Sequence, residues 1–306
     1  MENWHIPSFL RRILPRLVLE SLHELKWTKG VLPPHFPRPK EFQQSPGDIQ
    51  ASACMSIVVP IHDAPEVTRR CLASLERYAR ESEIILVDDA SRLSETLQII
   101  RDFSARNKWS VLHHEKPLGH SGACRDGADL ATRQYLCLLN SDAVVTPWCW
   151  RRVKEVFEQD HRIGVAGPST SYSGNLQALR MATILSSRWN DSQICTFASR
   201  LLTQVQEPLV VDLSWVSGFA FFIRRGLWER VGGFDQGLPD YGNEIDLCAR
   251  IAEEGYRMVW IRNCYIHHFG RQSYRGKIGN RGVRARIRRA EIYIRRKRNP
   301  WSTKDV

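Results

Sequence analysis

Short apolar runs alternate with helix-like segments between residues 56 and 142, and this alternation constrains the fold more than any other feature of the chain. Four runs predict buried strands, at Ser56–Val59, Glu83–Val87, Trp109–His113 and Tyr135–Leu139. The segments between them predict helices, at Glu66–Tyr78, Leu93–Phe103 and Ser121–Thr132. Strands that alternate with helices form a parallel sheet that carries helices on both faces. We therefore expect an α/β fold with a mostly parallel, Rossmann-like sheet.

Two of the predicted strands end in acidic turns. Asp88-Asp89 follows the second strand, and Asn140-Ser141-Asp142 follows the fourth. Ligands of open α/β sheets bind beyond the carboxyl ends of the strands, and hard divalent cations prefer oxygen ligands such as the carboxylate of Asp142. The turns therefore predict one ligand-binding edge of the sheet. The alternatives are an Asx turn or helix N-cap at the first and a plain polar turn at the second.

The second half of the chain predicts less regular structure. Trp150–Gln159 and Ile245–Glu254 predict helices, and Gly164–Gly167 and Arg257–Ile261 predict strands. Residues 169–210 give no clear pattern, and we expect a loop there that faces an acceptor.

Three regions follow one another along the chain. Residues 1–52 predict an amphipathic helix interrupted by Pro15 and then a Pro-rich linker, with the helix either packed on the main domain or lying on a membrane surface. Residues 53–273 predict the folded domain. Residues 274–306 form a basic region, in which residues 275–298 hold eleven Lys and Arg against one acid and so carry +10 of the net charge of +11.

The basic region predicts a cationic amphipathic helix. Val283, Ile287, Ala290 and Ile294 recur at helical spacing, with Arg at most other positions. We favour contact with an anionic membrane surface. A terminal helix packed on the body with solvated arginines is the alternative, and an arm that binds nucleic acid is the least favoured.

The eight cysteines predict reduced thiols in a cytosolic protein. None stands in a C-x-x-C pair, and several lie within apolar runs. No apolar stretch reaches the ~20 residues that span a bilayer, and arginines at 11, 12 and 16 interrupt the apolar residues near the N-terminus, so we expect no signal peptide. We therefore expect a cytoplasmic protein, with peripheral attachment to the inner face of the plasma membrane through its basic region.

Five motifs occur in a fixed order: Ser56–Pro60, Ile85–Ser91, Leu138–Asp142, Gly232–Asp235 and Asn243–Cys248. Together they resemble family 2 glycosyltransferases of the GT-A fold, over residues 54–273. Within that family the chain looks most like rhamnosyltransferases and other polysaccharide-assembly enzymes. The resemblance implies a nucleotide-sugar donor, Mg²⁺ or Mn²⁺ as cofactor, and a hydroxyl acceptor on a cell-surface glycan or a lipid-linked molecule.

The resemblance also implies a donor site for a UDP- or dTDP-sugar. A carboxylate near the base accepts the N–H of a pyrimidine-dione, and a guanidinium matches a diphosphate. Arg125 is implied to bind the diphosphate. The alternative is that Arg125 only faces solvent on its helix. The residues implied to bind the donor are Pro60, His62, Asp89, Arg125, Ser141 and Asp142.

The implied metal ligand is Asp142. Asn140-Ser141-Asp142 stands at the place of the family's Asp-x-Asp, with Asn140 in place of the first acid, so we expect weak metal binding before the donor arrives. His268, or His267 as the alternate, would add a metal or phosphate contact, and a structural role is the alternative for each.

Glu244 stands where the family has its catalytic Asp, in Asn243-Glu244-Ile245-Asp246. Its carboxylate would take the proton from an acceptor hydroxyl that attacks the anomeric carbon with inversion. The alternative is a helix N-terminal acid stabilised by the helix dipole. Trp215, Gly218 and Asp246 are implied to line the acceptor or sugar site, with core packing or helix capping as alternatives.

Two other functions compete with sugar transfer. A sugar nucleotidyltransferase needs a Gly-rich triphosphate loop with a Lys after the first strand, and Pro60–Asp63 supplies none. A catalytically degenerate GT-A-like domain that binds a glycan, a lipid or nucleic acid is the stronger alternative, because Asn140 and Glu244 depart from the family pattern.

Overall fold

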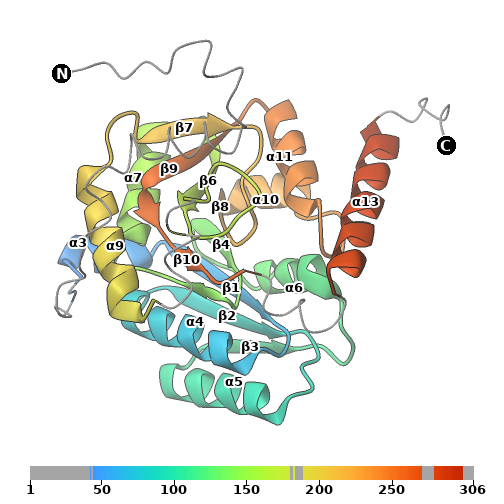
Figure 1. The fold of residues 1–306 in the computed structure, drawn as a ribbon, viewed down its shortest axis with the longest axis horizontal. Coiled ribbons are helices and arrows are strands. Elements are labelled where there is room, and N and C mark those ends of the chain that lie inside the picture. Colours follow the sequence, from blue (N-terminus) through green and yellow to red (C-terminus); the bar gives the residue numbers. More distant parts are fainter. Residues whose placement is uncertain (1–41, 43, 180–181, 183–188, 271–278, 299–306) are drawn as a thin grey trace.

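A computed structural model describes residue 42 and residues 44–179, 182, 189–270 and 279–298 (Figure 1). The helix predicted over residues 1–30 lies outside these residues. The helices are α3 (Pro46–Ser52), α4 (Pro65–Tyr78), α5 (Ser94–Asn107), α6 (Gly119–Ala128), α7 (Cys149–Gln159), α9 (Asp191–Gln204), α10 (Arg225–Val231), α11 (Asn243–Glu253) and α13 (Gly279–Arg298). The strands are β1 (Met55–Ile61), β2 (Glu83–Asp88), β3 (Ser110–His113), β4 (Tyr135–Leu139), β5 (Ala143–Val144), β6 (Ile163–Ser169), β7 (Val210–Leu213), β8 (Ala220–Arg224), β9 (Arg257–Tyr265) and β10 (His267–His268).

One large sheet organises the molecule in the order β3-β2-β1-β4-β8-β6-β9-β7. The first four strands pair in parallel, as the alternation of strands and helices predicted. β8 then runs antiparallel between β4 and β6, β9 runs parallel to β6, and β7 runs antiparallel at the edge. The sheet is therefore mostly parallel, with two antiparallel strands in its C-terminal half. A second, two-stranded sheet pairs β10 with β5.

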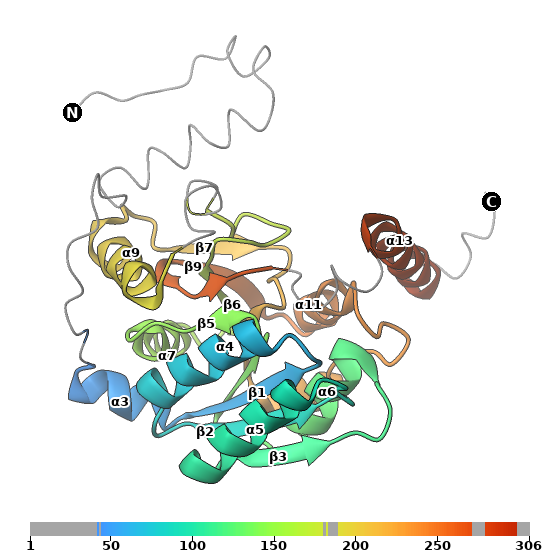
Figure 2. The same cartoon turned by 60° about the horizontal axis from the view of Figure 1, so that its bottom comes forward.

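Helices cover both faces of the sheet because successive side chains of a buried strand point to opposite sides. Ile57, Val59 and Ile61 of β1 pack with α4, α5 and α7, whereas Val58 packs with α6 and α11. Figures 1 and 2 place α11 and α13 on one side of the molecule and α3 and α9 on the other. All eight cysteines are unpaired, and seven are buried in this core.

Two segments that were expected to be linker or loop contain helices. Residues 46–52, assigned to the linker, form α3, which begins with a capping box between Ser45 and Asp48. Residues 169–210 contain α9, and this helix also begins with a capping box, formed by Asn190 and Gln193.

The C-terminal helix α13 packs on the loop that precedes α11. Tyr293 donates a hydrogen bond to Asp235 (3.0 Å), and Lys297 pairs with both Asp235 (2.5 Å) and Asp246 (2.9 Å). The buried Ala290 lies against the backbone of Gly242. Within the basic region, residues 279–298 form a helix, and its buried Ala290 faces the body of the protein. Within the residues that the structure describes, no helix is both long and apolar enough to cross a bilayer.

A substitution at Gly127 would test how closely α6 packs on the sheet. A Cβ at this position would lie 2.4 Å from Val58 Cγ1 and 2.8 Å from Val87 Cγ2. Gly127→Ala should therefore destabilise the protein by about 1–3 kcal/mol through overpacking, measured as a lower Tm. Gly226→Ala is the matched control, because a Cβ there meets no atom within 4 Å and should stabilise α10 by about 0.5–1 kcal/mol. Equal Tm values for the two variants would contradict this packing.

Candidate active site

The two acidic turns lie at the carboxyl ends of β2 and β4, the neighbours of β1 in the sheet. Asp89 is buried, and its carboxylate accepts the N–H groups of Leu118 (2.7 Å) and Gly119 (2.9 Å). Asp89 therefore fixes the start of α6, and only part of its accepting capacity is left for a nucleotide base.

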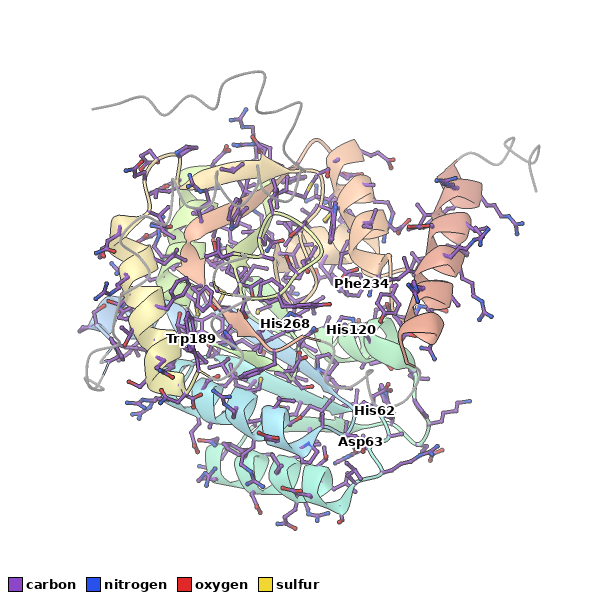
Figure 3. All side chains as sticks on the ribbon, viewed as in Figure 1. His62, Asp63, His120, Trp189, Phe234 and His268 are labelled. Atoms are coloured by element: carbon purple, nitrogen blue, oxygen red, sulfur yellow. The ribbon has the colours of Figure 1, made fainter. Side chains whose placement is uncertain are left out.

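The other predicted donor residues lie along the same edge. His62 donates from Nδ1 to the carbonyl oxygen of Asp89 at 2.7 Å, beside Asp63 (Figure 3). Pro60 is half-buried in β1, and Ser141 is buried. The Arg125 side chain is about a quarter exposed on α6, and the nearest carboxylate of the described residues is that of Asp126, at 3.9 Å. The Arg125 guanidinium can therefore bind an additional anion.

Asp142 and His268 are the predicted metal ligands that the structure brings together. His268 Nε2 lies 3.1 Å from Asp142 Oδ1, and both side chains are buried. They meet because β10 pairs with β5, which begins directly after Asp142. His268 Nδ1 lies 2.7 Å from the carbonyl oxygen of Tyr172. Since a carbonyl only accepts, Nδ1 carries the proton, and Nε2 of the neutral ring offers a lone pair to the site.

This pair of groups suits a divalent cation. A carboxylate oxygen and a neutral imidazole nitrogen at 3.1 Å need a proton or a cation between them. Burial works to lower the pKa of His268, but the neighbouring Asp142 carboxylate and the Tyr172 carbonyl outweigh it and raise the pKa. One oxygen and one imidazole nitrogen are also ligands of Mn²⁺. Among the described residues no group of three His, Cys, Asp or Glu side chains could hold a metal, so further ligands would come from bound phosphate or water.

His267, the alternate ligand, lies in different surroundings. Its ring is buried among aromatic side chains, with Phe269 at 4.6 Å and Trp189 at 6.4 Å between ring centroids. Burial, helped by the nearby charges of Arg70 and His268, lowers the pKa of His267 to about 3. His268 rather than His267 therefore lies against Asp142.

Glu244 is the second residue of α11 and is half-buried. Its Oε1 accepts the N–H of Gly218 at 3.1 Å. A Cβ at position 218 would lie 2.4 Å from this oxygen, so the observed position of Glu244 requires glycine there. Desolvation by burial raises the pKa of Glu244, while hydrogen bonds from the backbone N–H groups of Glu244 and Gly218 act against the rise. A carboxylate with a raised pKa is suited to general-base chemistry near neutral pH.

Two residues predicted for the acceptor site have structural partners. Trp215 is half-buried against the α6 and α11 side of the core. Asp246 is buried and pairs with Arg250 (2.8 Å) and Lys297 (2.9 Å). These contacts fit the alternative roles, which are core packing for Trp215 and helix support for Asp246. A role for either residue at the acceptor site stays a prediction.

Two histidines that the sequence analysis left out also lie at this edge. His114, directly after β3, contacts Asp89 (2.8 Å) and Asp126 (3.3 Å). His120, in the first turn of α6, has Nε2 at 3.1 Å from Asn140 Oδ1. The sequence could have indicated both residues, because one follows a predicted strand and the other begins a helix. Such positions face the ligand-binding edge of a parallel sheet.

Polar side chains connect Asp142 with Glu244. His268 Nε2 lies 3.4 Å from Asn140 Nδ2, and Asn140 contacts His120 on its other side. His120 Nδ1 in turn lies 3.4 Å from Asn243 Nδ2, and Asn243 Oδ1 accepts the N–H of Glu244. The candidate metal pair and the candidate base are therefore connected through the side chains of Asn140, His120 and Asn243.

A family model provides the identification. The model described as "Glycosyl transferase family 2" matches residues 56–229, more than half of the chain. The chain belongs to glycosyl transferase family 2. The family 2 match includes the turn at Asn140-Ser141-Asp142 and ends before Glu244 and His268, and its domain is a glycosyltransferase domain.

A curated relative of this family 2 domain is the O-antigen biosynthesis protein RfbC of Myxococcus xanthus. It is 23% identical over 236 residues, which cover 72% of this chain and 18% of RfbC. The chain thus spans only a small part of the length of this relative.

Two solved structures share the fold. GalNAc-T7, solved with UDP, GalNAc and Mn²⁺, superimposes with a TM-score of 0.55 at 17% identity, over 70% of this chain and 42% of that chain. The mannosyltransferase PcManGT from Pyrobaculum calidifontis, solved with GDP-Man and Mn²⁺, gives a TM-score of 0.52 at 16% identity, over 93% of this chain and 79% of that chain. The expected GT-A fold is confirmed.

The pairing of His268 with Asp142 predicts a pH dependence for metal binding. Mn²⁺ must displace the proton of His268, whose pKa is raised above its ordinary value of 6.5. Mn²⁺ affinity, measured by electron paramagnetic resonance with UDP present, should fall as the pH drops through this raised pKa. Asp142→Asn should bind Mn²⁺ weakly at every pH, and the exposed His161→Ala should behave as wild type. Affinity that stays constant between pH 8 and pH 6 would contradict the assignment.

Proposed function

We propose that this chain is an inverting, metal-dependent glycosyltransferase that moves a hexosyl or deoxyhexosyl group from a UDP- or dTDP-sugar to a hydroxyl group. The acceptor is a growing cell-surface glycan or a lipid-linked glycan at the cytoplasmic face of the plasma membrane. The proposal depends on one observation. Contacts between polar side chains connect Asp142 with Glu244. Family 2 membership and the relation to an O-antigen biosynthesis protein support sugar transfer into a surface glycan.

Glu244 acts as the general base in this proposal. Its carboxylate accepts the proton of the acceptor hydroxyl while that oxygen bonds to the anomeric carbon. The bond from this carbon to the diphosphate breaks on the opposite face, its electron pair stays on the diphosphate oxygen, and the configuration is inverted. The Gly218 N–H holds Oε1 in place during the transfer, and Arg125 donates hydrogen bonds to the diphosphate.

Asp142 and His268 hold Mg²⁺ or Mn²⁺ in this proposal. When bound, the cation would offset the charge that develops on the leaving diphosphate. Two protein ligands make a weak site, so nucleotide and metal should bind together. The presence of Mn²⁺ with UDP or with GDP-Man in the two solved relatives of this fold supports such a pair. Asp89 and His62 are proposed to select the pyrimidine base, and titration with UDP, dTDP and GDP in the presence of Mn²⁺ measures that choice.

Glu244→Gln and Asp142→Ala separate the two proposed roles. Glu244→Gln should keep the affinity for UDP with Mn²⁺ but lose about 100- to 10,000-fold in transfer rate, as expected when a general base is removed. Asp142→Ala should lose both metal-dependent UDP binding and transfer. The measurements are nucleotide affinity by calorimetry and product formation by mass spectrometry.

Glu253→Gln, an exposed change on the same helix, is the control and should match wild type. Wild-type transfer by Glu244→Gln would reject its role as base. A wild-type protein that binds nucleotide or glycan but transfers no sugar would instead favour the catalytically degenerate binding module.

We also propose that the exposed arginines of α13 bring the protein to anionic lipid. Because Ala290 and Ile294 face the body, the contact is electrostatic and does not depend on an apolar face entering the bilayer. The arginines on the exposed side are Arg284, Arg288, Arg289, Arg295 and Arg296. Each charge near such a surface contributes about 1 kcal/mol.

Flotation of the full chain with phosphatidylglycerol vesicles tests this surface. Wild type should float at low salt and less at high salt, since salt screens exposed charges. Arg288→Glu together with Arg295→Glu should float least, and the exposed body variant Arg69→Glu is the control. Equal flotation of all three proteins would reject the proposal, and salt-sensitive retention on RNA in place of lipid would favour nucleic acid.

A further inference from the structure

His120 lies at the centre of the site but belongs to none of the roles proposed above. It sits in the first turn of α6 and is half-buried, with its ring 6.2 Å from that of Phe234. Figure 3 shows it near His268 and Phe234. Its two ring nitrogens contact side chains from two other parts of the chain, Asn140 after β4 and Asn243 at the start of α11. The ring therefore connects three segments that the sheet brings to one edge.

The partners of His120 define its tautomer. Asn140 Oδ1 only accepts, so Nε2 of His120 carries the proton and donates to it at 3.1 Å. Asn243 Nδ2 only donates, so Nδ1 of His120 offers its lone pair, at 3.4 Å. Asn140 Nδ2 lies 3.4 Å from Nε2 of His268. If the Asn140 amide were turned around, its Oδ1 would face the lone pair of the neutral His268 ring, and two acceptors would meet. One orientation of Asn140 therefore serves both histidines.

Asn243 transmits this arrangement to Glu244. It is fully buried, and its amide nitrogen also donates to Ser121 Oγ at 2.8 Å. Its Oδ1 accepts the backbone N–H of Glu244 at 3.0 Å. With the Gly218 N–H on Oε1, the backbone and the carboxylate of Glu244 are both held by hydrogen bonds. A change in the His120 ring would thus reach the base through a single buried side chain.

We propose that His120 is a positioning residue, which holds the turn at Asn140 and the start of α11 at Asn243 in a fixed relation so that Glu244 faces the bound donor. The inference rests on the proposed function, because Glu244 must be the base for this position to matter. It also gives Asn140 a role: its carbonyl oxygen accepts from His120, and its amide nitrogen lies 3.4 Å from His268 Nε2. The side chain of Asn140 thus acts as a bridge between two rings.

His120→Ala and His120→Gln test the proposal. His120→Ala should lower kcat by about 10- to 100-fold, the usual effect of removing a group that orients a functional residue. KM for the donor and the affinity for UDP with Mn²⁺ should change less than twofold. His120→Gln should recover part of kcat, because its amide N–H can still donate to Asn140. Asn140→Leu should lower kcat similarly, and the double variant should be no worse than the poorer single variant. The exposed His161→Ala is the control.

The outcomes separate this inference from the proposed function. Wild-type kcat in His120→Ala, alongside an inactive Glu244→Gln, would overturn the positioning role and leave the base in place. Wild-type kcat in Glu244→Gln would overturn the proposed function itself. If no acceptor yields product, nitrogen-15 spectra of the histidine rings decide: His120 should carry its proton on Nε2, with a shift that changes in Asn140→Leu. A proton on Nδ1, or no change in that variant, would overturn the inference.

Discussion

The antiparallel register of β4 and β8 is the constraint on which the site depends. It pairs Leu139 with Ala220, so the residues just beyond each strand end also meet, and the N–H of Asn140 donates to the carbonyl oxygen of Phe219 at 2.9 Å. Gly218, the next residue along, binds Glu244. Because side chains alternate along a strand, a shift of one residue would turn Leu136 and Leu138 away from their core. Burial of the strand therefore fixes the distance between the two ends of the site.

Three buried polar side chains of the site have partners that define their orientation. Asp89, Asn243 and His268 each contact at least two groups from other parts of the chain. An unpaired polar group in such a position would cost about 1–3 kcal/mol, so these contacts stabilise one arrangement over its alternatives. The same contacts leave the Arg125 guanidinium with capacity for a ligand, on the exposed side of α6. The site thus combines buried side chains that are held by hydrogen bonds with the positive charge of Arg125, which can bind an anion.

The sequence predicted the parallel half of the sheet well, because each of its strands is a continuous apolar run with a helix pattern on either side. It predicted α9 poorly although the capping box of Asn190 and Gln193 was present, since the surrounding residues showed no clear period. The antiparallel β8 follows from pairing with distant strands, which leaves no local signature. His120 was missed for the same reason: its partners Asn140 and Asn243 lie 20 and 123 residues away, and only the folded sheet brings them together. Asp246 is a motif position whose carboxylate pairs with Arg250 and Lys297.

The attachment of α13 to the loop before Glu244 affects the order in which parts of the molecule unfold. Most of the contacts that hold this helix are ion pairs near the surface, whereas the sheet is held by a dry apolar core, and ionic strength weakens only the first kind. High salt would therefore free the terminal helix while the sheet stays folded. The loop from Asp235 to Gly242 would then lose its outer support, and the chain would lose its working geometry while most of its helices and strands were still folded.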